Sequence, residues 1–125
     1  MDETSPLSGL QVLIVEDMFL IALELADQLA DSGCDVIGPA ASVKEALASI
    51  DGVALDGAVL DVNLAGERSF PIAEHLSSRG IPFLFLTGYD SVAAFPAEFQ
   101  QVTRLSKPVD LKALVDAVAA FGRRT

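Results

Sequence analysis

The chain alternates between short apolar segments and longer amphipathic ones. The apolar segments have the length and composition of strands that are buried on both faces of a sheet. We expect strands at Leu10–Val15, Asp35–Pro39, Gly57–Leu60, Ile81–Leu86 and Val102–Leu105. Strands that alternate with helices predict right-handed crossovers and one parallel sheet with helices on both faces. The expected fold class is therefore α/β.

The segments between these strands carry helical patterns and helix-end signals. We expect helices at Phe19–Ala30, from Ser42, at Phe70–Ser78 and from Asp110. The second helix opens with a capping box, in which the hydroxyl of Ser42 accepts from the Glu45 amide and the Glu45 side chain reaches back. The segment Tyr89–Gln101 contains Pro96 and has little amphipathic pattern, so the fourth helix should be short or irregular.

Length and composition fit one globular domain. A chain of 125 residues can bury one hydrophobic core, and a hydrophobic content of 51% is typical of a folded protein rather than a disordered one. We expect residues 1–9 to be a flexible lead and residues 10–122 to form the domain. The sequence shows no internal repeat and no linker to a second domain.

The charge argues against several kinds of partner. With a net charge of −10, the chain lacks the cationic surface that binding to nucleic acid or to an anionic membrane requires. The acidic N-terminal residues do not resemble a signal peptide, and no apolar stretch is long enough to span a bilayer. The single cysteine, Cys34, reads as a small core residue and fits a reducing compartment, so we expect a cytoplasmic protein.

Polar residues stand where the expected strands end. Glu16 and Asp17 follow the first strand, Asp61 follows the third, Thr87 follows the fourth, and Lys107 lies just past the fifth. Each has an ordinary explanation when it is taken alone, as a loop carboxylate, a helix cap, a strand-end hydroxyl or a surface lysine. The carboxyl ends of parallel strands meet at one edge of the sheet, where ligands of such folds bind. We therefore expect these side chains to form one site.

These residue types favour a metal ion and a phosphoryl group. Three clustered carboxylates repel one another unless a cation lies between them, and oxygen ligands select a hard ion, best Mg²⁺, to which Asn63 can add its backbone carbonyl. A carboxylate such as that of Asp61 is a competent nucleophile toward phosphorus. Lys107 and Thr87 would then contact phosphoryl oxygens. The Lys107–Pro108 bond is a candidate for the cis form.

The motifs in which these residues lie resemble those of the receiver domain of bacterial two-component response regulators. They are Val15-Glu16-Asp17, Leu60-Asp61-Val62-Asn63-Leu64, Leu86-Thr87-Gly88 and Ser106-Lys107-Pro108. The resemblance covers nearly the whole chain and implies a flavodoxin-like fold of five strands in the order 2-1-3-4-5. It also implies that Asp61 accepts phosphate from the phosphohistidine of a sensor kinase. Glu16 and Asp17 would serve Mg²⁺, Glu16 through water.

A narrower resemblance concerns the end of the fourth strand. Phe85-Leu86-Thr87-Gly88-Tyr89 is similar to a branch of receivers with the motif Phe-Ala-Thr-Gly-hydrophobic-Tyr, although Leu86 replaces Ala and Asp90 stands at the last position. Members of that branch are often stand-alone receivers with a poorly formed fourth helix and kinases of the HWE type. Arg104 occupies the position of the usual switch aromatic, so the usual switch cannot be carried over. Tyr89 either covers the phosphoryl site or is a surface aromatic.

Three functional classes compete for this pattern. The first is a phosphorylatable switch, a monomer or weak dimer that acts through a protein contact or through relay to a histidine phosphotransferase. It would support only its own phosphorylation and dephosphorylation, and the chain ends at Thr125 with no room for a DNA-binding output domain. The second is a phosphohydrolase resembling haloacid dehalogenases, which needs a general acid/base at position 63, a role that Asn63 cannot fill. The third is a flavin-binding flavodoxin-like module, which needs a phosphate-binding loop after the first strand. Glu16 and Asp17 stand there instead and would repel the phosphate.

Overall fold

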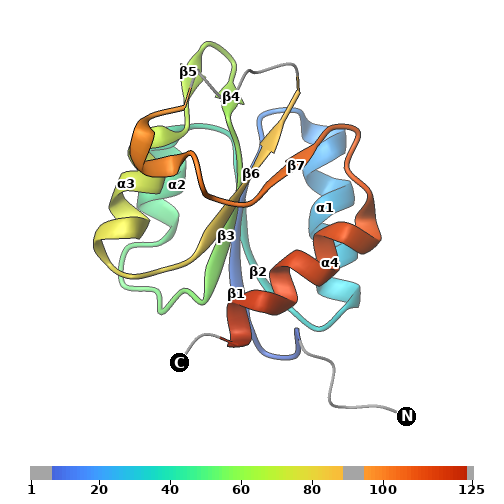
Figure 1. Ribbon diagram of the computed structural model, residues 1–125. Coiled ribbons are helices and arrows are strands. Elements are labelled where there is room, and N and C mark those ends of the chain that lie inside the picture. The colour runs from blue at the N-terminus through green and yellow to red at the C-terminus, as the bar shows by residue number, and fades with distance from the viewer. Residues whose placement is uncertain (1–6, 89–94, 124–125) are drawn as a thin grey trace.

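A computed structural model describes residues 7–88 and 95–123 of the chain (Figure 1). One parallel sheet of five strands runs through the centre, in the order β2-β1-β3-β6-β7. Its strands are β1 (Gln11–Val15), β2 (Asp35–Ala40), β3 (Gly57–Asp61), β6 (Phe83–Thr87) and β7 (Arg104–Ser106). Numbered within the sheet alone, this is the order 2-1-3-4-5, so the predicted α/β fold is confirmed.

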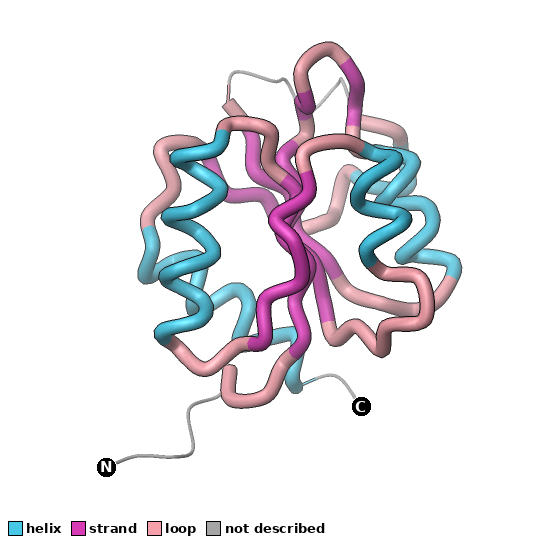
Figure 2. Tube along the Cα trace, turned by 180° about the vertical axis from the view of Figure 1, so that it is seen from behind, coloured by secondary structure: helices cyan, strands magenta, loops and turns pink. Residues whose placement is uncertain are grey.

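Helices cover both faces of the sheet (Figures 1 and 2). One face carries α1 (Phe19–Asp31) and α4 (Leu111–Ala119), followed by the 3-10 turn η3 (Ala120–Arg123). The other carries α2 (Val43–Ser49), α3 (Phe70–Ser78) and the 3-10 turn η2 (Ala97–Phe99). Within the described ranges, no helix is both long and apolar enough to cross a membrane.

The three central strands supply both hydrophobic cores. Along β1, Leu13 and Val15 point into the α2–α3 face, whereas Val12 and Ile14 point into the α1–α4 face. All four side chains are fully buried. This period-two alternation with apolar residues on both sides is why the strands read as continuous apolar segments in the sequence.

The helices begin where the sequence supplies capping groups. The Ser42 hydroxyl accepts from the Glu45 amide at 3.1 Å, and Glu45 Oε1 accepts from the Ala41 amide at 2.6 Å, which together cap α2. Asp110 caps α4 by accepting from the Lys112 amide at 3.0 Å. The cap of α1 differs from the expected pattern, because Met18 holds that position and donates its amide to Glu16 Oε2 at 3.1 Å.

Several expected boundaries shift. The fourth sheet strand begins at Phe83 rather than Ile81, after Pro82, which has no N–H to donate. The fifth begins at Arg104 rather than Val102, because the Val102 amide closes a turn onto Phe99. Of the irregular fourth helical segment, residues 89–94 lie outside the described residues, and the part that is described forms only η2.

The expectation of a flexible lead is wrong for its last residues. Leu7 is 1% exposed and belongs to the α1–α4 core, and the Gly9 amide donates to the Gly33 carbonyl at 3.0 Å. The lead therefore packs against the end of α1 from residue 7 onward. Residues 1–6 lie outside the described residues.

A β-hairpin after β3 was not expected from the sequence. Its strands are β4 (Asn63–Leu64) and β5 (Glu67–Arg68), which pair antiparallel across a two-residue turn and stand at the top of Figure 1. Both turn residues have positive φ, 49° at Ala65 and 98° at Gly66. Such two-residue turns favour Asn-Gly or Gly-Gly, so Ala65 gave no sequence signal for the hairpin.

The two edges of the sheet are irregular. β7 is three residues long. β2 contains Gly38 and Pro39, joined by a cis peptide bond, and its register against β1 shifts between Leu13 and Val15. Long, straight pairing is therefore confined to the three inner strands.

Candidate functional site

The carboxyl edge of the sheet gathers the polar residues that the sequence pattern predicts. Glu16 and Asp17 follow β1, Asp61 ends β3 and Thr87 ends β6. Lys107 directly follows β7, and its amide donates to the Thr87 carbonyl at 2.8 Å. The register of the parallel strands is what aligns these ends, because β1, β3, β6 and β7 pair residue by residue.

Three carboxylates form the negative part of the site. One oxygen each from Glu16, Asp17 and Asp61 lies within 4.8 Å of the others. Glu16 is 2% exposed and Asp61 4%, so two of the three charges are nearly removed from water. Such an arrangement is costly unless cations balance it.

Lys107 supplies part of that balance. Its Nζ donates to Asp61 Oδ2 at 2.8 Å and lies 3.1 Å from Glu16 Oε1. The second contact is an ion pair without hydrogen-bond geometry, so Glu16 Oε1 is buried with no hydrogen-bond partner. One ammonium therefore balances the charge of two carboxylates, and it donates a hydrogen bond only to Asp61.

The pKa values reflect the burial of this charged cluster. Burial, followed by the contact with Asp61, raises the pKa of Glu16 to about 7 from an ordinary value of 4.5. Burial lowers the pKa of Lys107, but the contacts with Asp61 and Glu16 outweigh it, and the net pKa lies above the usual value. Lys107 thus stays charged, while burial disfavours the charged form of Glu16.

A pocket of about 400 Å³ opens over these groups. Its lining residues are Asp17, Met18, Asp61, Asn63, Ala65, Gly66, Gly88 and Lys107. Asp61 and Lys107 supply charged groups to the pocket. The β4–β5 hairpin contributes three of the lining residues, Asn63, Ala65 and Gly66. The pocket is wide enough for a phosphoryl group and hydrated ion beside the carboxylate.

The donor set fits a hard divalent cation. Its side chains offer only oxygen ligands, which suit Mg²⁺ with its retained waters better than a soft metal. Glu16 Oε1 is buried without a hydrogen-bond partner and shares the Lys107 ammonium with Asp61, so it can accept a further positive charge. Glu16, Asp17 and Asp61 would hold the ion, and Asn63 lies at the same pocket to offer its backbone carbonyl.

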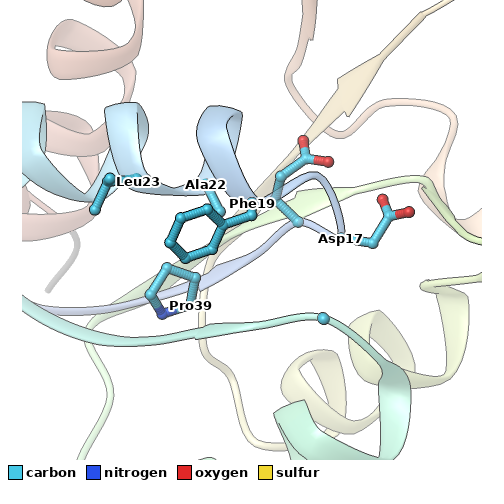
Figure 3. Close-up of a pocket in the computed structure, with 7 residues that line it drawn as sticks. Asp17, Phe19, Ala22, Leu23 and Pro39 are labelled. Atoms are coloured by element: carbon cyan, nitrogen blue, oxygen red, sulfur yellow. The ribbon is translucent and has the colours of Figure 1, made fainter.

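An apolar rim beside the site was not singled out in the sequence. Met18, Phe19, Leu20 and Leu23 are large apolar residues that are 57%, 74%, 76% and 44% exposed. Figure 3 shows Phe19 beside Pro39, with Leu23 farther along α1 and Asp17 on the side of the site. The signal was present for Phe19, Leu20 and Leu23, because they fall off the Ile21–Leu25–Leu29 face of α1, which already accounts for the burial of this helix.

This rim borders a second pocket, of about 270 Å³. Its lining residues are Glu16, Asp17, Phe19, Ala22, Leu23, Pro39 and Ala41. Asp17 lines both pockets, so the apolar surface continues into the charged site. Exposed apolar side chains grouped beside a charged site are a common feature of protein-binding surfaces.

Comparison with known families assigns the chain. The model of the response regulator receiver domain matches residues 12–119. The chain belongs to this family. The predicted resemblance is therefore confirmed, and with it a place in two-component signal transduction.

Solved receivers share the fold closely. SdrG from Sphingomonas melonis Fr1 is 40% identical with a TM-score of 0.77, over 94% of this chain and 98% of that one. The non-phosphorylated HemR receiver domain from Leptospira biflexa is 25% identical with a TM-score of 0.79, over 94% and 97%.

Curated relatives are longer proteins. The sensory transduction protein LytT of Bacillus subtilis is 35% identical over 81% of this chain and 43% of its own length. The transcriptional regulatory protein TcrA of Mycobacterium tuberculosis is 31% identical over 94% of this chain and 47% of its own length. The chain spans about half the length of the curated relatives it matches.

The receiver family accounts for the gathered residues but leaves their individual roles as predictions. The structure brings Glu16, Asp17, Asp61 and Lys107 into contact or near contact, with Thr87 at the adjoining strand end. Tyr89 and Asp90, on which the narrower resemblance depends, lie outside the described residues. The Lys107–Pro108 peptide bond is cis, as expected.

Proposed function

We propose that this receiver domain is a phosphorylatable signalling switch in which Asp61 accepts a phosphoryl group from a sensor histidine kinase, in a reaction that requires Mg²⁺. The observation that carries the proposal is the position of Asp61. It is the carboxylate that lines the open pocket while its Oδ2 contacts the ammonium of Lys107 at 2.8 Å.

The other carboxylates suit supporting roles. Glu16 is 2% exposed, does not line that pocket, and has one oxygen engaged by the Met18 amide. Asp17 is half-buried and lines the pocket from the β1 side. We assign Glu16 and Asp17 to the metal, Glu16 through water, and Asn63 as a further ligand through its backbone carbonyl.

The transfer itself is a displacement at phosphorus. An Asp61 carboxylate oxygen forms the new P–O bond as the P–N bond of the donor phosphohistidine breaks, and the imidazole leaves with the electron pair and takes up a proton. Lys107 neutralises charge on one phosphoryl oxygen and Thr87 donates to another. A bound Mg²⁺ supplies further neutralisation of the phosphoryl oxygens.

The apolar rim fits a protein as the phosphodonor. A small donor would need only the charged pocket, whereas Met18, Phe19, Leu20 and Leu23 lie beside it at a cost in exposed apolar surface. We assign this rim as the docking surface of the sensor kinase. The narrower resemblance suggests that this kinase is of the HWE type. A histidine phosphotransferase would dock in the same way if phosphate is relayed onward.

Other parts of the assignment follow from charge. The net charge of −10 disfavours direct contact with nucleic acid or with an anionic membrane, and the single buried cysteine fits the reducing cytoplasm. We propose a cytoplasmic monomer or weak dimer that catalyses only its own phosphorylation and dephosphorylation.

Mass spectrometry of the intact protein tests the acceptor. After incubation with acetyl phosphate and Mg²⁺, we expect a phosphoryl adduct that EDTA suppresses and that Asp61→Asn abolishes. Asp116→Asn on the exposed surface of α4 is the control with the same change of group, and it should keep the adduct. An adduct of equal yield on Asp61→Asn would refute the assignment.

Phosphotransfer kinetics test the donor surface. Leu20→Ala should slow transfer from a phosphorylated histidine kinase by about tenfold, because an exposed apolar anchor is lost. Labelling by acetyl phosphate should be unchanged in the same variant. Equal losses with both donors would move the effect of Leu20 from docking to the site itself.

A further inference from the structure

The β4–β5 hairpin is a wall of the phosphoryl pocket that needs support from outside. Three of its residues, Asn63, Ala65 and Gly66, line the pocket. Its turn adopts φ of 49° at Ala65, a conformation that an L-residue with a Cβ disfavours. Two paired residues on each strand are too few to hold such a turn in place by themselves.

The base of the hairpin is fixed by the core. Leu64 is 1% exposed and belongs to the α2–α3 core, and the Ser69 amide donates to the Val62 carbonyl at 3.0 Å. These contacts hold the two ends of the hairpin together. They leave the lateral position of the outer part of the hairpin, which includes the pocket-lining turn residues Ala65 and Gly66, to other contacts.

Glu67 provides a lateral contact. Its Oε2 accepts from the backbone amide of Val43 at 3.0 Å, across 24 positions of sequence. Val43 is the first residue of α2, where a backbone N–H has no acceptor within the helix. The cap of α2 leaves this amide to Glu67, because Ser42 accepts from Glu45 and Glu45 accepts from Ala41.

We propose that Glu67 is a positioning residue for the metal and phosphoryl site, which it serves by tying the hairpin wall to the first turn of α2. The inference rests on the proposed function and adds to it a path from the site to a helix on the α2–α3 face. By linkage, occupancy of the site that the hairpin lines and formation of the Glu67–Val43 bond favour each other. Binding of Mg²⁺ therefore also strengthens the bond that holds the hairpin to the start of α2.

Isothermal calorimetry with Mg²⁺ tests the tie on the whole chain. Glu67→Ala should weaken Mg²⁺ binding by about three- to tenfold, because it removes the acceptor of one charge-assisted hydrogen bond at an exposed position. Glu74→Ala on the exposed surface of α3 removes the same side chain and charge and should leave the affinity unchanged. This control separates the tie from the general loss of a negative charge.

Val43→Pro breaks the same bond from its other end. Proline has no N–H, is favoured at the first position of a helix, and accepts the extended backbone of Ser42, at φ −148° and ψ 165°. It changes no charge and touches no pocket residue. We expect it to weaken Mg²⁺ binding as Glu67→Ala does, and the double variant to bind no more weakly than either one.

In NMR spectra, the response of the Val43 amide resonance to Mg²⁺ distinguishes a positioning role of Glu67 from a purely structural one. Saturation with Mg²⁺ should shift the Val43 amide resonance in the wild type and in Glu74→Ala, but not in Glu67→Ala. Thermal unfolding of each variant establishes that it is folded.

The outcomes distinguish the two proposals. Unchanged Mg²⁺ affinity in folded Glu67→Ala, or losses in Glu67→Ala and Val43→Pro that add in full, would overturn the inference while the phosphorylation switch stands. A folded wild type that takes up neither Mg²⁺ nor phosphate would overturn the proposed function, and the role of Glu67 with it.

Discussion

The two faces of the sheet are covered by different kinds of side chain. On the α1–α4 face, two regular helices bury aliphatic side chains such as Leu25, Leu29 and Leu114. On the α2–α3 face, a cluster of rings fills the region between β6, α3 and η2. Its members are Phe70, Phe83, Phe85, Phe95 and Phe99, with ring centroids 5.1–6.1 Å apart in the contacting pairs.

This difference shows how a face can be closed with little helix. Among the described residues between β6 and β7, the regular structure is only the three-residue turn η2, yet Phe95 is 3% and Phe99 2% exposed. Large rings reach the sheet from irregular backbone because each one buries much apolar area. Side-chain size thus replaces helical regularity on this face.

The largest expected effect comes from removing the ring at the centre of the cluster. Phe85 is fully buried and contacts four other rings, so Phe85→Ala should lower the free energy of unfolding by about 3–5 kcal/mol. Urea denaturation measures the change. Phe19→Ala makes the same chemical change at a ring that is 74% exposed, and should stay within about 0.5 kcal/mol of wild type. Similar losses at the two positions would show that the ring cluster does not close its face.

The next effect probes the opposite face, where a single ring meets the sheet. A Cβ placed at Gly57 would clash with the Phe121 ring, so Gly57→Ala should cost about 1–3 kcal/mol in unfolding free energy. Gly88→Ala is the control, because its Cβ would meet open space. Combining Gly57→Ala with Phe121→Leu should recover part of the loss. If Gly57→Ala is as mild as Gly88→Ala, Phe121 is not seated against β3.

The dependence of stability on pH isolates the charged edge from both faces. The folded pKa of Glu16, about 7, lies above its ordinary value of 4.5, so the folded protein binds more protons between these pH values. Without Mg²⁺, the contribution of Glu16 to the free energy of unfolding should therefore be largest below pH 4.5. This contribution should fall by roughly 1–2 kcal/mol as the pH rises through 7. Thermal melts in EDTA measure this fall.

The matched variant for that experiment is Glu16→Gln, which removes the titrating group and should flatten the profile across the same range. Phe85→Ala should lower the whole curve and leave its slope unchanged. A slope that survives in Glu16→Gln would assign the pH dependence to another carboxylate.

The smallest effect lies at the outer surface of the ring cluster. The Arg104 guanidinium lies 5.3 Å from the centroid of Phe95, and its Nη1 donates to the Gln100 carbonyl at 2.9 Å. Arg104→Lys keeps the charge but loses the planar contact, and should cost about 0.5–1 kcal/mol in urea denaturation. Arg79→Lys on α3 is the control and should be neutral. An equally neutral Arg104→Lys would leave the closure of this face to the rings alone.

Much of the fold was predictable because its signals are local. The sheet strands are continuous apolar segments, and Ser42, Pro71 and Asp110 mark helix starts that the structure keeps. Parallel topology then aligned the strand ends, so that Asp61 and Lys107, 46 positions apart, could be placed together from the sequence. The positions of such residues can be predicted from the sequence because strands and helices have a repeating backbone geometry.

The rest depended on contacts that no local pattern encodes. The hairpin turn contains Ala65 where Asn or Gly would have given a signal, and its lateral bond from Glu67 reaches Val43 far along the chain. The burial of Leu7 is set by the end of α1, although the residues around it have the composition of a free terminus. The exposure of Phe19 and Leu20, in contrast, does have a local signal, because the Ile21–Leu25–Leu29 pattern already defines the buried face of α1.

The irregular margins of the sheet bear on the behaviour of the protein at high concentration. A row of free backbone amides and carbonyls invites a strand from a neighbouring molecule to join. At one margin β7 is only three residues long, and at the other Pro39 lacks an N–H and the register breaks. Neither margin presents a straight template, so the described fold resists aggregation through strand addition, and the apolar rim of α1 stays free to meet partners by side-chain contacts alone.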